Sequence, residues 1–145
     1  MNNKQMVEKV IPTGFLLLLL LLLMSCNTPR IIVKDDLTGL RTFTSVEFPP
    51  KLNGQNSFMQ EFMAKFSFKY EQEEQRQYGV IVQFVIDKRG HLVGARIPGK
   101  KEQNYTRVEK EIINTLNQIQ GWTPAKKDGK DVNVLVTTRL NIGFR

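Results

Sequence analysis

The stretch "YGVIVQFVIDKRGHLVGARIP", residues 78–98, decides the fold because it contains two strands and the turn that joins them. Tyr78 to Asp87 is rich in β-branched and aromatic residues, as is typical of a strand. The next residues, "DKRG", form a turn in which Gly90 suits a left-handed position. Residues 91–98 return as a second strand, and Pro98 ends its pairing. So short a turn permits only antiparallel pairing of the two strands.

Two capping boxes predict where two helices begin. The sequences "SFMQ" at 57–60 and "TRVE" at 106–109 each place Ser or Thr three residues before Gln or Glu. Apolar residues follow both boxes at helical spacing, and the Phe and Met side chains of the first set suit core packing better than a ligand pocket. We therefore expect helices over 57–70 and 106–120, the second stopped by Gly121.

The last strand shows the clearest alternation in the chain. From Val132 to Ile142, apolar and polar residues alternate with a period of two. The order of the predicted elements is α-β-β-α-β. This order predicts an α+β fold in which two helices pack on one face of a three-stranded antiparallel sheet.

The beginning of the chain has the layout of a secretory signal. The apolar run Phe15–Met24 follows a basic segment and is too short for the roughly 20 residues that a membrane-spanning helix needs. "LMSC", ending at Cys26, resembles the bacterial lipobox. That resemblance implies cleavage before Cys26 and acylation of this residue, the only cysteine of the chain. The alternative is a retained anchor, since Val10 and Ile11 could extend the apolar run.

These features divide the chain into three parts. Residues 1–25 are expected to be a lipoprotein signal peptide, and residues 26–45, which show no sustained periodicity, a flexible tether. The tether could span about 65 Å if fully extended. Residues 46–145 are expected to form one domain.

Charge and composition exclude several classes of function. The formal net charge is +7 and falls to +6 without residues 1–25, which carry Lys4, Lys9 and Glu8. Export argues against a nucleic-acid partner, and no stretch interleaves aromatic residues with a basic run. His91 follows the hairpin turn, where a solvated position suits it better than a catalytic one. With no metal-ligand spacing and no phosphate-binding loop in the sequence, we expect neither an enzyme nor a cofactor.

Three stretches resemble one family, the C-terminal domain of the energy-transducing protein TonB, in the versions found in Bacteroidetes-like bacteria. They are "VEFPPKLNGQNSFMQEFMAKFSFKY" (46–70), "YGVIVQFVIDKRGHLVGARI" (78–97) and "GWTPAKKDGKDVNVLVTTRLNIGF" (121–144). The third contains the family's most specific signature, Trp-x-Pro-Ala followed by polar residues, Gly and the last strand. The three stretches lie in the family's order and cover nearly all of the expected domain.

The resemblance implies a domain that binds other proteins. In the family, a short segment of an outer-membrane transporter adds as a strand beside the last strand of the domain, which is β-augmentation. The partners implied are TonB-dependent transporters or other envelope proteins, together with the membrane that the lipid occupies. The residues that this implies here form the edge strand: Val132, Val134, Val136, Thr137, Thr138 and Arg139.

Two departures from the family favour a binding module over an energy transducer. A lipid anchor replaces the retained transmembrane helix, and the spacer is short. Two alternatives stay open: a transducer that keeps the leucine run as its anchor, and a structural envelope lipoprotein that binds peptidoglycan or forms a homodimer through its sheet edge. Asn27, rather than Asp, follows Cys26, which favours the outer membrane by the lipoprotein sorting rule.

Overall fold

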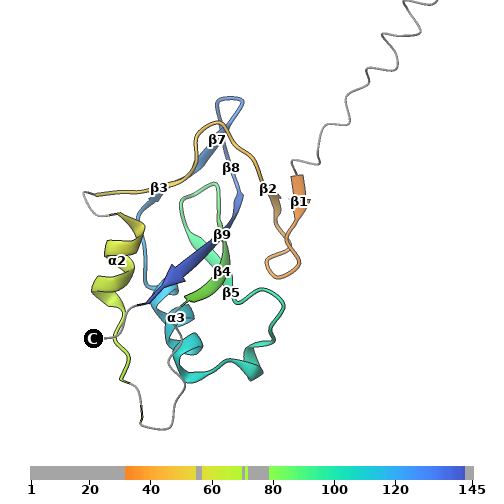
Figure 1. The fold of residues 1–145 in the computed structure, drawn as a ribbon. Coiled ribbons are helices and arrows are strands. Elements are labelled where there is room, and N and C mark those ends of the chain that lie inside the picture. Colours follow the sequence, from red (N-terminus) through yellow and green to blue (C-terminus); the bar gives the residue numbers. More distant parts are fainter. Residues whose placement is uncertain (1–31, 55–56, 70, 72–78, 143–145) are drawn as a thin grey trace, which may run out of the picture.

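The structure is a computed structural model that describes residues 32–54, 57–69, 71 and 79–142 (Figure 1). These residues form an α+β fold around a five-stranded mixed sheet with the strand order β1-β2-β9-β4-β5. Cys26, the expected lipidation residue, and residues 1–25, the expected signal peptide, lie outside the described residues.

The centre of the sheet is an antiparallel pair, β4 (Gly79–Ile86) and β9 (Val134–Asn141). They pair continuously from Gly79 opposite Asn141 to Ile86 opposite Val134. β5 (Leu92–Arg96) pairs with the other side of β4. These strands confirm the predicted hairpin and the predicted antiparallel last strand.

The hairpin turn is held by the Asp87 side chain. Its Oδ1 atom accepts hydrogen bonds from the backbone amides of Arg89 at 2.8 Å and His91 at 2.9 Å. Gly90 adopts a φ of 84°, as the turn requires. Burial raises the pKa of the Asp87 carboxyl, but these hydrogen bonds outweigh burial and leave the pKa below its ordinary value.

Both predicted capping boxes are present. α2 (Phe58–Lys65) begins after Ser57, and α3 (Arg107–Asn117) begins after Thr106. At the second box, the Glu109 side chain accepts the Thr106 amide at 2.8 Å and also pairs with Lys100 at 2.6 Å. This buried carboxylate therefore fixes the helix start and the preceding loop together.

Both helices are shorter than predicted. α2 ends at Lys65 instead of residue 70 because Phe66 takes an extended conformation, with a ψ of 121°. The Phe66 ring still stacks on Phe62 at 5.3 Å, so the apolar spacing continues beyond the helix itself. α3 ends at Asn117 instead of residue 120, although Ile119 is fully buried.

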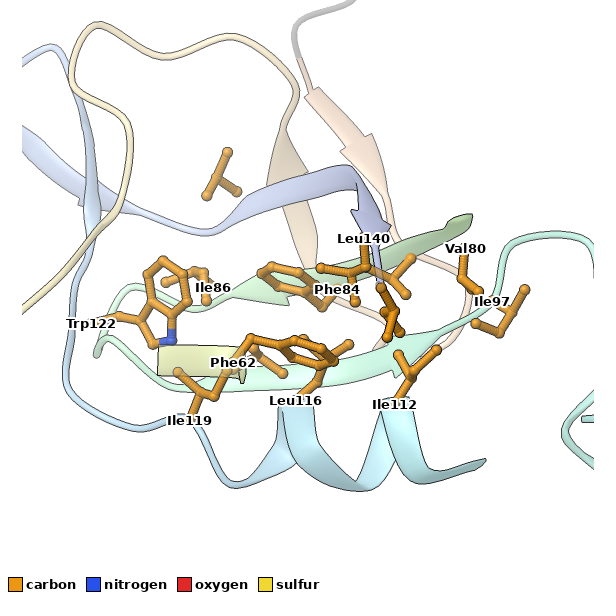
Figure 2. Close-up of a cluster of buried hydrophobic side chains, with 14 of the residues drawn as sticks. Phe62, Val80, Phe84, Ile86, Ile97, Ile112, Leu116, Ile119, Trp122 and Leu140 are labelled. Carbon is orange, nitrogen blue, oxygen red and sulfur yellow. The ribbon is translucent and has the colours of Figure 1, made fainter. Parts of the chain in front are cut away.

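The hydrophobic core lies between the helices and one face of the sheet (Figure 2). Alternate residues of β4 point into it from the sheet, and both helices contribute apolar side chains from the other side. The fully buried members are Phe62, Val82, Phe84, Ile86, Ile112, Leu116, Ile119, Ala125, Leu140 and Ile142.

The sheet differs from the predicted three-stranded antiparallel one. β1 (Ile32–Lys34) and β2 (Arg41–Phe43) form an antiparallel hairpin that joins β9 in parallel, with Phe43 opposite Val134. Residues 32–43 were expected to belong to a flexible tether. Two strands of three residues are too short to show a sequence period, which explains why the alternation analysis did not find them.

Smaller elements connect the main ones. β3 (Lys51–Leu52) pairs with β6 (Trp122–Thr123), β7 (Ala125–Lys127) pairs with β8 (Lys130–Val132), and η1 (Glu102–Asn104) precedes α3. The predicted last strand therefore begins at residue 134 instead of 132. The turn between β7 and β8 contains Asp128 and Gly129, both with positive φ, which is the Asp-Gly pair of a tight hairpin.

Replacement of Gly90 by alanine tests how closely the hairpin turn packs. A Cβ atom at this residue would lie 2.1 Å from the Trp122 carbonyl oxygen, so Gly90→Ala forces the turn away from β6. We expect a loss of at least about 2 kcal/mol in the free energy of unfolding, measured with urea.

Gly99→Ala is the matched control. Gly99 also has a positive φ, 74°, but a Cβ atom at this residue would meet no atom beyond its chain neighbours within 4 Å. Gly99→Ala therefore measures the cost of a positive φ at alanine without any steric clash. Equal losses in the two variants would contradict the close contact between the turn and β6.

Candidate functional site

The candidate site is the side of β9 that faces away from β4. β2 covers this side only where β9 begins: the Phe43 amide donates to the Asn133 carbonyl at 2.8 Å, and the pairing register contains the single pair Phe43–Val134. Beyond Val134, no strand of the described residues pairs with this side. β9 is therefore an inner strand at its start and an edge strand along the rest of its length.

The alternation of the backbone shows which groups this edge presents. In an antiparallel pair, every second residue directs its amide and carbonyl toward the partner strand. The Asn133 carbonyl points toward β2, so Thr137 and Arg139, in the same phase, direct theirs away from β4. No described residue pairs with those outward backbone groups, so within the described part of the chain this edge is open to an added strand.

An apolar groove of about 410 Å³ runs beside this edge. The rings of Phe58, Phe84 and Trp122 pack together along it, with centroids 5.7 to 6.2 Å apart. The segment that follows β2 forms another part of the lining. The lining residues are Thr44, Val46, Pro49, Pro50, Phe58, Phe84, Trp122, Val134, Leu135, Val136, Thr137 and Thr138.

The structure brings part of the predicted edge to this groove. Val136, Thr137 and Thr138 line it, whereas Arg139 lies past its end. Thr137 is exposed, and its hydroxyl accepts a hydrogen bond from the side-chain Nε2 of Gln83 at 3.0 Å. The Arg139 guanidinium lies against Gly79, where a Cβ atom would approach it to 2.6 Å.

Two predicted edge residues do not belong to the open edge. Val132 lies in β8, where it pairs with Ala125. Val134 is buried and lies opposite Phe43 of β2. The prediction that Val132 and Val134 belong to the binding edge is therefore wrong. Val132 lies in the short strand β8 and Val134 is covered by the short strand β2, and the alternation in the sequence shows neither strand.

Sequence reasoning missed the opposite wall of the groove. Phe58 was expected only as a core residue, and Pro49 and Pro50 only as the entry to the domain. Two consecutive prolines lack amide hydrogens and hold an extended conformation, which keeps this segment from closing onto β9 as a strand. The Pro-Pro pair in the sequence is the signal that could have predicted this wall of the groove.

Asp35 anchors the β1–β2 hairpin across the sheet. Its carboxylate is 2% exposed and accepts hydrogen bonds from the Thr38 amide at 2.9 Å and the Thr38 hydroxyl at 2.7 Å. It also forms an ion pair with Arg96 of β5, which lies opposite Gln83. The turn of the hairpin therefore reaches the far strand of the sheet while β2 touches β9 only at its start.

The charge on Asp35 is stabilised in the folded protein. Burial raises the pKa of its carboxyl, but the two hydrogen bonds from Thr38 and the Arg96 guanidinium together outweigh burial, so the pKa lies below its ordinary value. A lowered pKa means that this interaction contributes stability above the pKa of the unfolded chain and loses it as pH falls through the folded value.

Comparisons with known proteins add no further assignment. No protein family model, no curated protein and no solved structure matches the chain. Within the described ranges, no helix has the length and apolar character needed to cross a membrane. Nor do His, Cys, Asp and Glu side chains cluster there in a way that could hold a metal ion.

Replacement of Asp35 by asparagine tests the hairpin anchor. Asp35→Asn is expected to lower the free energy of unfolding by about 2 kcal/mol at neutral pH, because it removes a charge-assisted bond to Arg96. The difference from the parent should begin to shrink below about pH 4, the ordinary pKa of an aspartate in the unfolded chain, and should disappear once the folded carboxyl is protonated at lower pH. Urea unfolding at a series of pH values from neutral to about pH 2.5 measures this difference.

Asp36→Asn is the control, since this exposed neighbour should change stability by less than about 0.5 kcal/mol. A stability difference for Asp35→Asn that stays constant down to the lowest pH would contradict the ionised anchor.

Proposed function

We propose that the chain is an exported, lipid-anchored protein of the cell envelope whose domain binds an extended segment of another envelope protein. The guest segment adds as a strand to the open side of β9. The observation that carries this proposal is that β2 covers β9 only at Val134, beside the apolar groove.

Strand addition suits this edge for two physical reasons. The outward backbone groups of Thr137 and Arg139 can hydrogen-bond a guest backbone whatever its sequence. The groove can take the alternate side chains of the guest that point toward Phe58 and Trp122, and this contact supplies selectivity. Because β2 occupies the first position, the guest is confined to residues 135–141 of β9.

The resemblance to the TonB C-terminal domain supports the same side of the last strand as the binding edge. It also suggests the class of partner, the TonB-dependent outer-membrane transporters. The five-stranded sheet departs from the two-helix, three-strand fold that the resemblance implies, since β1 and β2 are additional strands. We propose binding without energy transduction and no enzymatic role, with the outer membrane as the location.

The mass of the intact protein, extracted from the membranes of its native host, tests the anchor. We expect a mass equal to residues 26–145 plus the acyl groups on Cys26. A mass equal to the full chain would contradict lipidation. It would favour the alternative in which residues 15–24 remain as a membrane anchor and the protein transduces energy to a transporter.

Proline at residue 137 tests the binding edge. Proline lacks the amide that Thr137 directs away from β4, so Thr137→Pro removes a donor from the open edge and leaves the ladder with β4 intact. The probes are synthetic peptides that copy the periplasmic N-terminal segments of the host's transporters. We expect calorimetry to show binding of at least one peptide to the parent and a loss of at least about tenfold in affinity for the variant.

Thr137→Val is the matched control for that variant. It removes the hydroxyl bonded to Gln83 but keeps the backbone amide, so peptide binding should persist. Circular dichroism checks that both variants fold. Equal binding by Thr137→Pro and the parent, or no binding by any peptide, would reject the transporter-binding proposal. A parent dimer that Thr137→Pro dissociates would favour the structural lipoprotein that self-associates through this edge.

A further inference from the structure

The domain begins much closer to the proposed lipid than a 20-residue tether would place it. β1 begins at Ile32, six residues after Cys26. Six residues of fully extended chain span at most about 20 Å. The hairpin is fixed to the rest of the domain by Asp35 and Arg96, so it cannot extend to lengthen this connection without breaking a buried ion pair.

The part of the domain nearest to Cys26 in sequence also exposes apolar side chains. Ile32 is 40% exposed, Val33 is 42% exposed and Leu37, in the adjoining turn, is 59% exposed. Ile32 and Val33 are neighbours in a strand and point to opposite faces of it. A surface that contacts both must therefore meet β1 along its outer edge, which no described strand occupies.

Basic residues accompany these apolar ones. Lys34 ends β1 and is exposed. Leu37 lines two shallow hollows together with Lys100 and Lys101, and Lys101 is exposed. Apolar side chains flanked by lysines are the composition of surfaces that bind the interface of an anionic bilayer.

We infer that the β1 edge and the adjoining turn, residues 32–37, rest on the surface of an anionic phospholipid bilayer. Ile32, Val33 and Leu37 enter the interface, and Lys34 and Lys101 contact the headgroups. The inference rests on the proposed acylation of Cys26, and it adds a fixed orientation of the domain on the membrane.

The connection to the lipid favours the bilayer over a second copy of the chain as the occupant. A lipidated Cys26 holds Ile32, where this surface begins, within about 20 Å of lipid at all times, so the local concentration of lipid beside the surface is high. β1 has three residues and offers a second copy only a short ladder.

Fluorescence quenching by brominated lipids tests the orientation. The lipidated protein is reconstituted into phosphatidylethanolamine–phosphatidylglycerol vesicles with brominated acyl chains. The proposed lipidation joins the Cys26 sulfur to diacylglycerol in a thioether, so a new cysteine is the sole site for a thiol-reactive fluorophore. The probe variants are Leu37→Cys and, as control, Met63→Cys, which replaces an exposed apolar residue on α2.

We expect the bromolipid to quench the label at residue 37 and to leave the label at residue 63 unchanged. Equal quenching at the two residues, or none at residue 37, overturns the inference. A label at residue 37 that is shielded from solvent but is not quenched by the bromolipid would also overturn the inference. If that label becomes exposed to solvent when the protein is diluted among more vesicles, the surface is covered by a second copy of the chain instead.

Mass spectrometry of the same sample separates the orientation from the proposed function on which it rests. A protein without acyl groups overturns the anchor and the orientation together. A lipidated protein whose label at residue 37 stays unquenched overturns the orientation alone.

Discussion

The antiparallel ladder between β4 and β9 is the interaction on which the other elements depend. It joins residues far apart in the chain, such as Gln83 and Thr137, which are separated by 54 residues. On one face of the ladder, alternate apolar residues meet Phe62 of α2 and Leu116 of α3. On the other face, Gln83 lies opposite Arg96, to which the β1–β2 hairpin is tied. The ladder therefore fixes the positions of the core and the hairpin, and so defines which side of β9 stays open.

The elements that sequence reasoning identified are those with a strong local pattern. The hairpin after Asp87, the capping boxes at Ser57 and Thr106, and the alternation that leads into β9 each depend on residues within a few positions of one another. Such patterns reflect interactions that form within one turn or one strand, so they can be recognised in the sequence without knowledge of the tertiary fold. They were sufficient for the α+β class and for the order of the main elements.

The elements that were not predicted depend on distant contacts. Asp35 and Arg96 are separated by 61 residues, and nothing near Asp35 in sequence indicates the guanidinium that it binds. The same holds for the groove, whose walls come from the segment around Pro50, from Phe58 and from β9. The alternation that identified Thr137 also included Val132 and Val134, because a period of two does not show where one short strand stops and the next begins. Whether a strand lies at the edge or in the interior depends on the whole sheet, so the sequence of one strand does not predict it.

The position of β9 near the end of the described chain has a consequence for the order of folding. A nascent chain that lacks residues 134–141 has β4 without its longest partner, and the apolar face of β4 then has only part of its packing. Closing the ladder brings together segments with a long loop between them, which costs chain entropy and makes folding slow relative to helix formation. Until β9 arrives, the capped helices and the hairpin at Asp87 can form locally, but the sheet cannot. The domain is thus completed late, by a single long-range pairing step between β4 and β9.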